Sequence, residues 1–124
     1  QIARAGLEAV AYAVRANLEQ AQAVAGAAAE LIAVGGGMTK TAAWVDLIAD
    51  VLGRPTHVLT PNVSALGAYV CAATARGDFS SLEEGATEVS RGARVIEPDV
   101  RAAAEYTDHY QDWLGLAERL HGGE

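Results

Sequence analysis

Three consecutive glycines at positions 35–37 separate a short apolar run from a segment with helical spacing. The run at residues 30–34 is short and contains β-branched side chains, so we predict a buried strand there. Residues 39–52 follow a helical pattern, and Gly53 with Pro55 just beyond it is typical of a helix end. The expected apolar face of this helix consists of Trp44, Leu47, Ile48, Val51 and Leu52. The glycines must therefore turn the chain sharply from a strand into a helix.

The remaining pattern alternates helices with short extended segments. Residues 2–29 predict a long helix with an apolar stripe of Ile2, Gly6, Ala9, Val10, Ala13, Val14 and Leu18. We further predict a strand at 56–59, a helix at 64–76, a short helix opened by the Ser81–Glu84 capping box, an extended segment at 94–96 and a helix at 99–120. This alternation is typical of the α/β class. Two short strands are too few for a stable sheet, so we expect residues 1–124 to be one partial domain, helix-rich with a small partial sheet, cut from a longer protein.

Composition excludes several classes of function. The formal net charge is -7 and the isoelectric point about 4.8, which argues against nucleic acid and anionic membranes as partners. No apolar stretch approaches the ~20 residues that span a bilayer, and we expect a cytoplasmic protein. Cys71 is the only cysteine, so an internal disulfide and a cysteine-based metal site are both excluded. Its apolar neighbours predict a buried structural thiol.

The glycine turn is the one segment whose residues suggest chemistry. Its backbone N–H groups can approach an anion closely, Thr39 and Thr41 offer hydroxyls, and Lys40 offers a charge. The spacing fits neither the Walker A loop nor the dinucleotide fingerprint. From the residues alone, two interpretations stay open: a contact surface for phosphate or ribose, or a tight turn that needs glycine only for its geometry.

Other polar and aromatic residues are interpreted as structural. We expect Asp50 to pair with Arg54 or a backbone group, because it lies at the end of its helix far from the glycines. His57 and His109 have no carboxylate or cysteine at a ligand spacing, so we expect no metal site. The helical spacing of Tyr106, Tyr110, Trp113 and Leu114 predicts a packing stripe.

An ordered set of motifs decides between the two interpretations of the glycine turn. It consists of Gly36-Gly37-Met38-Thr39-Lys40-Thr41, Trp44, Ala49-Asp50-Val51-Leu52-Gly53-Arg54-Pro55, Ala65-Leu66-Gly67-Ala68 and Ala73-Thr74-Ala75-Arg76-Gly77. Together with the flanking helices the set covers essentially the whole chain, and it resembles the FGGY carbohydrate kinases, which include xylulokinases, gluconokinases, ribulokinases and glycerol kinases. Asn62 departs from the pattern, since an acidic residue is common there, as do Tyr69 and Asp46.

The resemblance implies part of an actin/hexokinase/ribonuclease H-like ATPase domain, with ATP and a sugar or polyol bound between two domains. It implies that the backbone of Gly36 and Gly37 contacts ATP near the α-phosphate and ribose. Thr41 would face the adenine and Met38 would cover the adenosine, with Mg²⁺ carried by ATP.

The family's catalytic aspartate lies in a Gly-x-x-Asp-Gln-like segment, which this sequence lacks, so we expect no catalytic residue in this chain. A xylulokinase-like pentulose kinase and a homo-oligomer are favoured. The alternative is a degenerate, non-catalytic α/β interaction module of the same fold.

Overall fold

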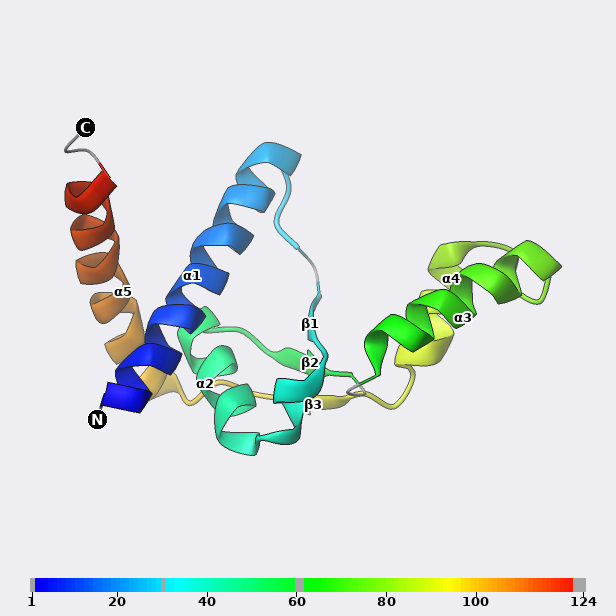
Figure 1. The fold of residues 1–124 in the computed structure, drawn as a ribbon, viewed down its shortest axis with the longest axis horizontal. Helices are drawn as coiled ribbons and strands as arrows, with labels where there is room; N and C mark the ends of the chain where they lie inside the picture. The colour runs from blue at the N-terminus through cyan, green and yellow to red at the C-terminus, as the bar shows by residue number, and fades with distance from the viewer. Residues whose placement is uncertain (1, 30, 60–61, 122–124) are drawn as a thin grey trace.

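The computed structural model describes residues 2–29, 31–59 and 62–121 of the chain (Figure 1). The elements run in the order α1 (Ile2–Ala25), β1 (Ile32–Val34), the 3₁₀ helix η1 (Gly37–Lys40), α2 (Ala42–Leu52), β2 (Thr56–Val58), α3 (Val63–Arg76), α4 (Leu82–Ser90), β3 (Arg94–Ile96) and α5 (Val100–His121). Helices dominate and the strands are short, so the predicted helix-rich α/β class is confirmed. None of the helices in the described ranges is long and apolar enough to cross a membrane.

The sheet has three strands in the order β1-β2-β3. β1 and β2 are parallel, with Ile32 opposite Thr56, and β3 adds in the antiparallel direction, with Thr56 opposite Ile96. Expecting only two strands was therefore wrong, because residues 94–96 were predicted as extended but not as a sheet partner. Helix α2 packs against β2 and β3.

The hydrophobic core lies where α1, α2 and α5 meet. Its buried members are Ala11, Tyr12, Ile48, Val51 and Tyr110, with Trp44, Tyr106, Trp113 and Leu114 packed against them. The aromatic packing stripe predicted for the last helix is thus confirmed, and its rings contact Tyr12 of α1. The apolar stripe predicted for α1 is not the buried face of this helix, since Ile2, Val10 and Val14 are exposed.

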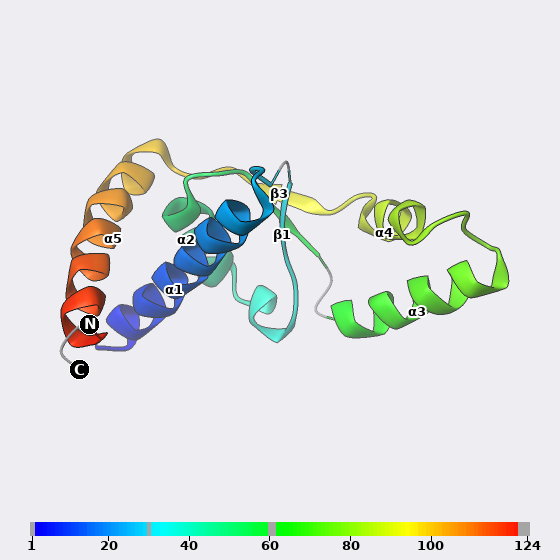
Figure 2. The same ribbon diagram turned by 90° about the horizontal axis from the view of Figure 1, so that it is seen from above.

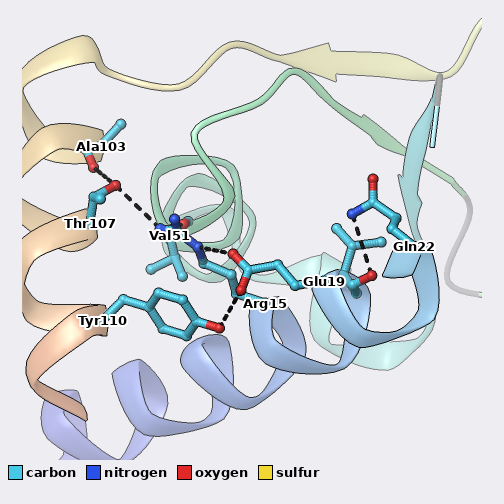
Figure 3. Close-up of polar contacts among 8 residues, drawn as sticks. Arg15, Glu19, Gln22, Val51, Ala103, Thr107 and Tyr110 are labelled. Atoms are coloured by element: carbon cyan, nitrogen blue, oxygen red, sulfur yellow. Dashed lines mark hydrogen bonds and ion pairs between the residues drawn. The ribbon is translucent and has the colours of Figure 1, made fainter. Parts of the chain in front are cut away.

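A polar clamp joins the same three helices (Figure 3). Arg15 of α1 donates hydrogen bonds to Glu19, to the carbonyl oxygen of Val51 at the end of α2, and to the Thr107 hydroxyl of α5, at 3.0, 3.0 and 3.2 Å. The Arg15 guanidinium also lies 4.3 Å from the centre of the Tyr110 ring, a cation–π contact. The Tyr110 hydroxyl donates to Glu19 at 2.7 Å. The clamp therefore ties α1 to α2 and α5 through a partly buried Arg15 and a more exposed Glu19.

The clamp predicts a pH dependence of stability at alkaline pH. Burial, reinforced by the hydrogen bond to Glu19, raises the pKa of Tyr110 to about 12. An unfolded tyrosine titrates near about pH 10, so the folded chain holds this proton more tightly and the stabilisation is complete below that pH. It is lost as pH rises from about 10 to about 12. We therefore expect the stability difference between wild type and Tyr110→Phe, measured by denaturant unfolding at several pH values, to shrink over this window. A constant difference would contradict the assignment.

Helices α3 and α4 pack on each other and project away from the α1, α2 and α5 core (Figures 1 and 2). The predicted capping box is present in altered form: the Ser81 hydroxyl accepts from the Glu84 N–H at 3.1 Å, whereas the Glu84 carboxylate accepts from the N–H of Ser80. The prediction of a buried Cys71 was wrong. Val70 and Ala73 are the buried residues of α3, and Cys71 lies about 100° around the helix from Val70, where it is exposed.

Candidate functional site

The glycine turn lies at the carboxyl end of β1, between that strand and α2. The parallel pairing brings the end of β2 to the same edge, where the Leu59 N–H donates to the Val34 carbonyl at 2.8 Å. Loops beyond the carboxyl ends of parallel strands are the usual position of ligand sites in α/β sheets. The predicted site residues Gly36, Gly37, Met38 and Thr41 thus all belong to one connection at this edge.

The three glycines differ in what the fold requires of them. A side chain at Gly35 would overlap Val63, the first residue of α3, so this glycine permits close packing. Gly36 has φ 100° and ψ -178°, a conformation in which an L side chain is strained. Gly37 has neither a positive φ nor any atom within 4 Å of where its Cβ would lie. Within this chain, neither packing nor backbone conformation therefore explains a glycine at 37.

The packing of Gly35 leads to a prediction about stability. We expect Gly35→Ala to lower the unfolding temperature, because the new methyl group overlaps the stiff β-branched Val63. The cost should be about 1 to 3 kcal/mol, a typical value for overpacking. Thermal unfolding of Gly35→Ala, Val63→Ala and the double variant measures it. The double variant should be more stable than the sum of the two single effects predicts. Strict additivity would mean that the two residues do not collide.

The side chains of the turn divide into exposed and buried groups. Met38 is 50% exposed, and Lys40 and Thr41 are also exposed. Thr41 is the N-cap residue of α2, yet its side chain makes no capping hydrogen bond, so its hydroxyl is not needed by the helix. The arrangement leaves Met38 and Thr41 accessible on the same connection as the two glycine backbones.

Thr39 does not have the position that the sequence suggested. The residue is only 9% exposed, and its hydroxyl donates to the Gly36 carbonyl at 2.7 Å instead of facing outward. The helical pattern from residue 39 also begins differently, because η1 covers 37–40 and α2 starts at Ala42. A threonine three residues after a glycine carbonyl is the signal that could have revealed this bond, since such hydroxyls often bond to nearby backbone.

The other polar candidates have structural surroundings. The Asp50 carboxylate accepts from the Asp99 N–H at 2.8 Å, which confirms its pairing with a backbone group. His57 lies on β2 and His109 on α5, against the Tyr106 ring. Among the described residues, no group of three or more His, Cys, Asp or Glu side chains is placed to hold a metal ion.

A cleft of about 330 Å³ lies between α3 and α4, and it reaches the edge that holds the glycine turn, because Leu59 and Val63 are part of its lining. Its lining includes Leu66, Val70, Leu82 and Val89 and is mainly apolar, so it offers little to a phosphate. The glycine turn itself lies on an open surface. It can therefore provide one wall of a binding site, with backbone groups and a few polar side chains but no enclosed cavity.

The arrangement of a short mixed sheet, a glycine turn and flanking helices is that of part of an actin-like ATPase domain, and comparisons with known proteins agree. Residues 1–76 match the model of the FGGY family of carbohydrate kinases, C-terminal domain. The chain belongs to this family.

Individual relatives extend the similarity beyond residue 76. The chain is 33% identical over 116 residues to the human FGGY carbohydrate kinase domain-containing protein, covering 92% of this chain and 21% of that protein. It is 32% identical over 101 residues to the autoinducer-2 kinase of Salmonella paratyphi B, covering 81% and 19%. The chain thus spans about a fifth of the length of these relatives.

Solved structures show the same fold. The structure superposes on the xylulose kinase from Rhodospirillum rubrum with a TM-score of 0.71 and 30% identity, covering 94% of this chain and 24% of that one. A xyloylose kinase from Brucella ovis gives a TM-score of 0.69 and 25% identity, covering 99% and 25%. The actin-like ATPase fold predicted from the sequence is therefore confirmed.

Proposed function

We propose that this chain is the ATP-binding part of a carbohydrate kinase. The observation that supports it most directly is the position of Gly37, which lies in the turn at the carboxyl end of β1 and borders open space there. A backbone without a Cβ at such a point lets a phosphate or ribose approach the amide groups closely. Membership of a carbohydrate kinase family supports ATP as the nucleotide.

The chain's residues would bind and position the nucleotide. The backbone of Gly36 and Gly37 would contact ATP near the α-phosphate and ribose, Met38 would cover the adenosine, and the Thr41 hydroxyl would face the adenine. These groups fit the ligand, because they are accessible on one connection and the two glycines border open space. Bound ATP supplies the γ-phosphoryl group that a sugar hydroxyl receives, and Mg²⁺ would arrive with it. Holding the adenosine end fixed reduces the entropy lost on reaching the transition state.

The proposal includes a role within a longer protein. We infer that residues 1–124 form one partial domain, and that the general base and the sugar site lie outside this chain. A pentulose is the favoured substrate, by resemblance to xylulokinases and by similarity to a solved xylulose kinase. An ATP-dependent sugar kinase would act in the cytoplasm, and the exposed apolar face of α1 supports a homo-oligomer.

Kinase assays test the proposal. The full-length protein that carries this sequence is incubated with ATP, Mg²⁺ and separately with xylulose, ribulose, gluconate, glycerol and autoinducer-2, and ADP formation is followed. We expect turnover with one of these acceptors, pentuloses first. The 124-residue chain alone should form no ADP above background. If the full-length protein neither binds ATP nor phosphorylates any acceptor, the chain is a non-catalytic module of the same fold.

A further inference from the structure

The peptide group between Gly36 and Gly37 is free to adopt two orientations unless something holds it. A peptide group is planar and trans, so its carbonyl oxygen and its N–H point in opposite directions. Turning this group over moves the N–H of Gly37 to the side where the Gly36 carbonyl was. Glycines on both sides of the bond remove the side-chain clashes that would otherwise prevent the turn.

Thr39 holds the carbonyl end of this peptide. Its hydroxyl donates to the Gly36 oxygen at 2.7 Å, and its backbone N–H donates to the same oxygen at 3.1 Å. Thr39 is only 9% exposed as a residue, so the hydroxyl bond is shielded from competing water. With the Gly36 oxygen held inward by two donors, the Gly37 N–H must point the opposite way, beside the open space at Gly37.

We propose that Thr39 is a positioning residue, which keeps the Gly36–Gly37 peptide turned so that its N–H, and not its carbonyl oxygen, meets the phosphate of the bound nucleotide. This inference rests on the proposed ATP-binding function. The flipped peptide would present a partial negative charge to the phosphate, which repels it. Thr39 therefore favours nucleotide binding without touching the ligand.

Calorimetric titration of ATP into the full-length protein that carries this sequence tests the role of the hydroxyl. Thr39→Val keeps the shape of the side chain and removes the hydroxyl, and we expect it to weaken ATP binding about tenfold, the effect of losing one hydrogen bond. Thr39→Ser keeps the hydroxyl and should bind within about twofold of wild type. The pair Thr39→Ala and Thr39→Ser repeats the comparison with a smaller side chain, so the hydroxyl is tested even if valine destabilises the turn.

Thr74→Val is the matched control. It removes a hydroxyl that donates to a backbone carbonyl, that of Val70, at 2.8 Å within α3. It should leave ATP affinity unchanged, with thermal unfolding recorded for every variant. Equal affinity of wild type, Thr39→Val and Thr39→Ala would overturn the role of Thr39, as would equal losses in the alanine and serine variants. Failure of the wild-type protein to bind ATP would instead overturn the proposed function, and the inference with it.

Discussion

Gly37→Val should raise the KM for ATP of the full-length kinase by about ten- to a hundredfold, with a much smaller change in the KM for the sugar. The branched side chain would occupy the open space beside the Gly37 amide and keep the phosphate away from it. A hydrogen bond to a charged group contributes roughly 1.5 to 3 kcal/mol, which corresponds to this range of affinity. Steady-state kinetics with each substrate varied in turn provides the measurement.

The folded structure should tolerate this substitution. Gly36 has a positive φ but Gly37 does not, so the backbone conformation at 37 does not exclude a side chain. Gly115→Val is a matched control, because Gly115 also has open space at its Cβ position and lies on α5, in a different part of the fold. It should leave both KM values unchanged. If Gly37→Val changed the two KM values equally, or neither, the turn would not be the nucleotide contact.

The glycine turn could be located from the sequence, but the division of roles within it could not. Three adjacent glycines after an apolar run predict a turn whatever each glycine does. That Gly35 packs against Val63 depends on a residue 28 positions later, and only the fold brings the two together. The hydrogen bond from Thr39 to Gly36 is local, yet an exposed hydroxyl and a buried one look the same in the sequence.

Some parts of the fold could likewise be predicted from the sequence and others could not. Helix ends are local features, so Gly53 was correctly placed beyond α2, where it adopts φ 62°. The prediction of which face of α1 is buried was wrong. Charged and aromatic residues contact α5 there, through the clamp of Arg15, Glu19 and Tyr110. An apolar pattern cannot predict a face whose polar groups are paired with a helix some 90 residues away. The pairing of β3 was missed for a different reason, since a three-residue strand carries almost no periodic signal.

Helix α1 carries exposed apolar side chains along one side. Leu7, Val10, Val14 and Val24 follow one another at spacings of three, four and ten and are all exposed, Val10 by 51%. Contiguous apolar surface of this kind usually marks an interface. The outer strands β1 and β3 present a second open surface, because within the described residues each pairs with β2 alone.

The 124-residue chain, expressed alone, should therefore self-associate at micromolar concentration. We expect light scattering over a dilution series to show a mass above 12.8 kDa that falls as the protein is diluted. Val10→Lys combined with Val14→Glu places charges in the stripe and should shift the chain toward monomer, whereas the exposed pair Glu83→Lys and Glu88→Lys on α4 should not. Association that survives the α1 changes would assign the contact to the strand edges instead. A well-folded monomer at all concentrations would mean that this chain buries its own apolar surface without a partner, and that it is not a partial domain.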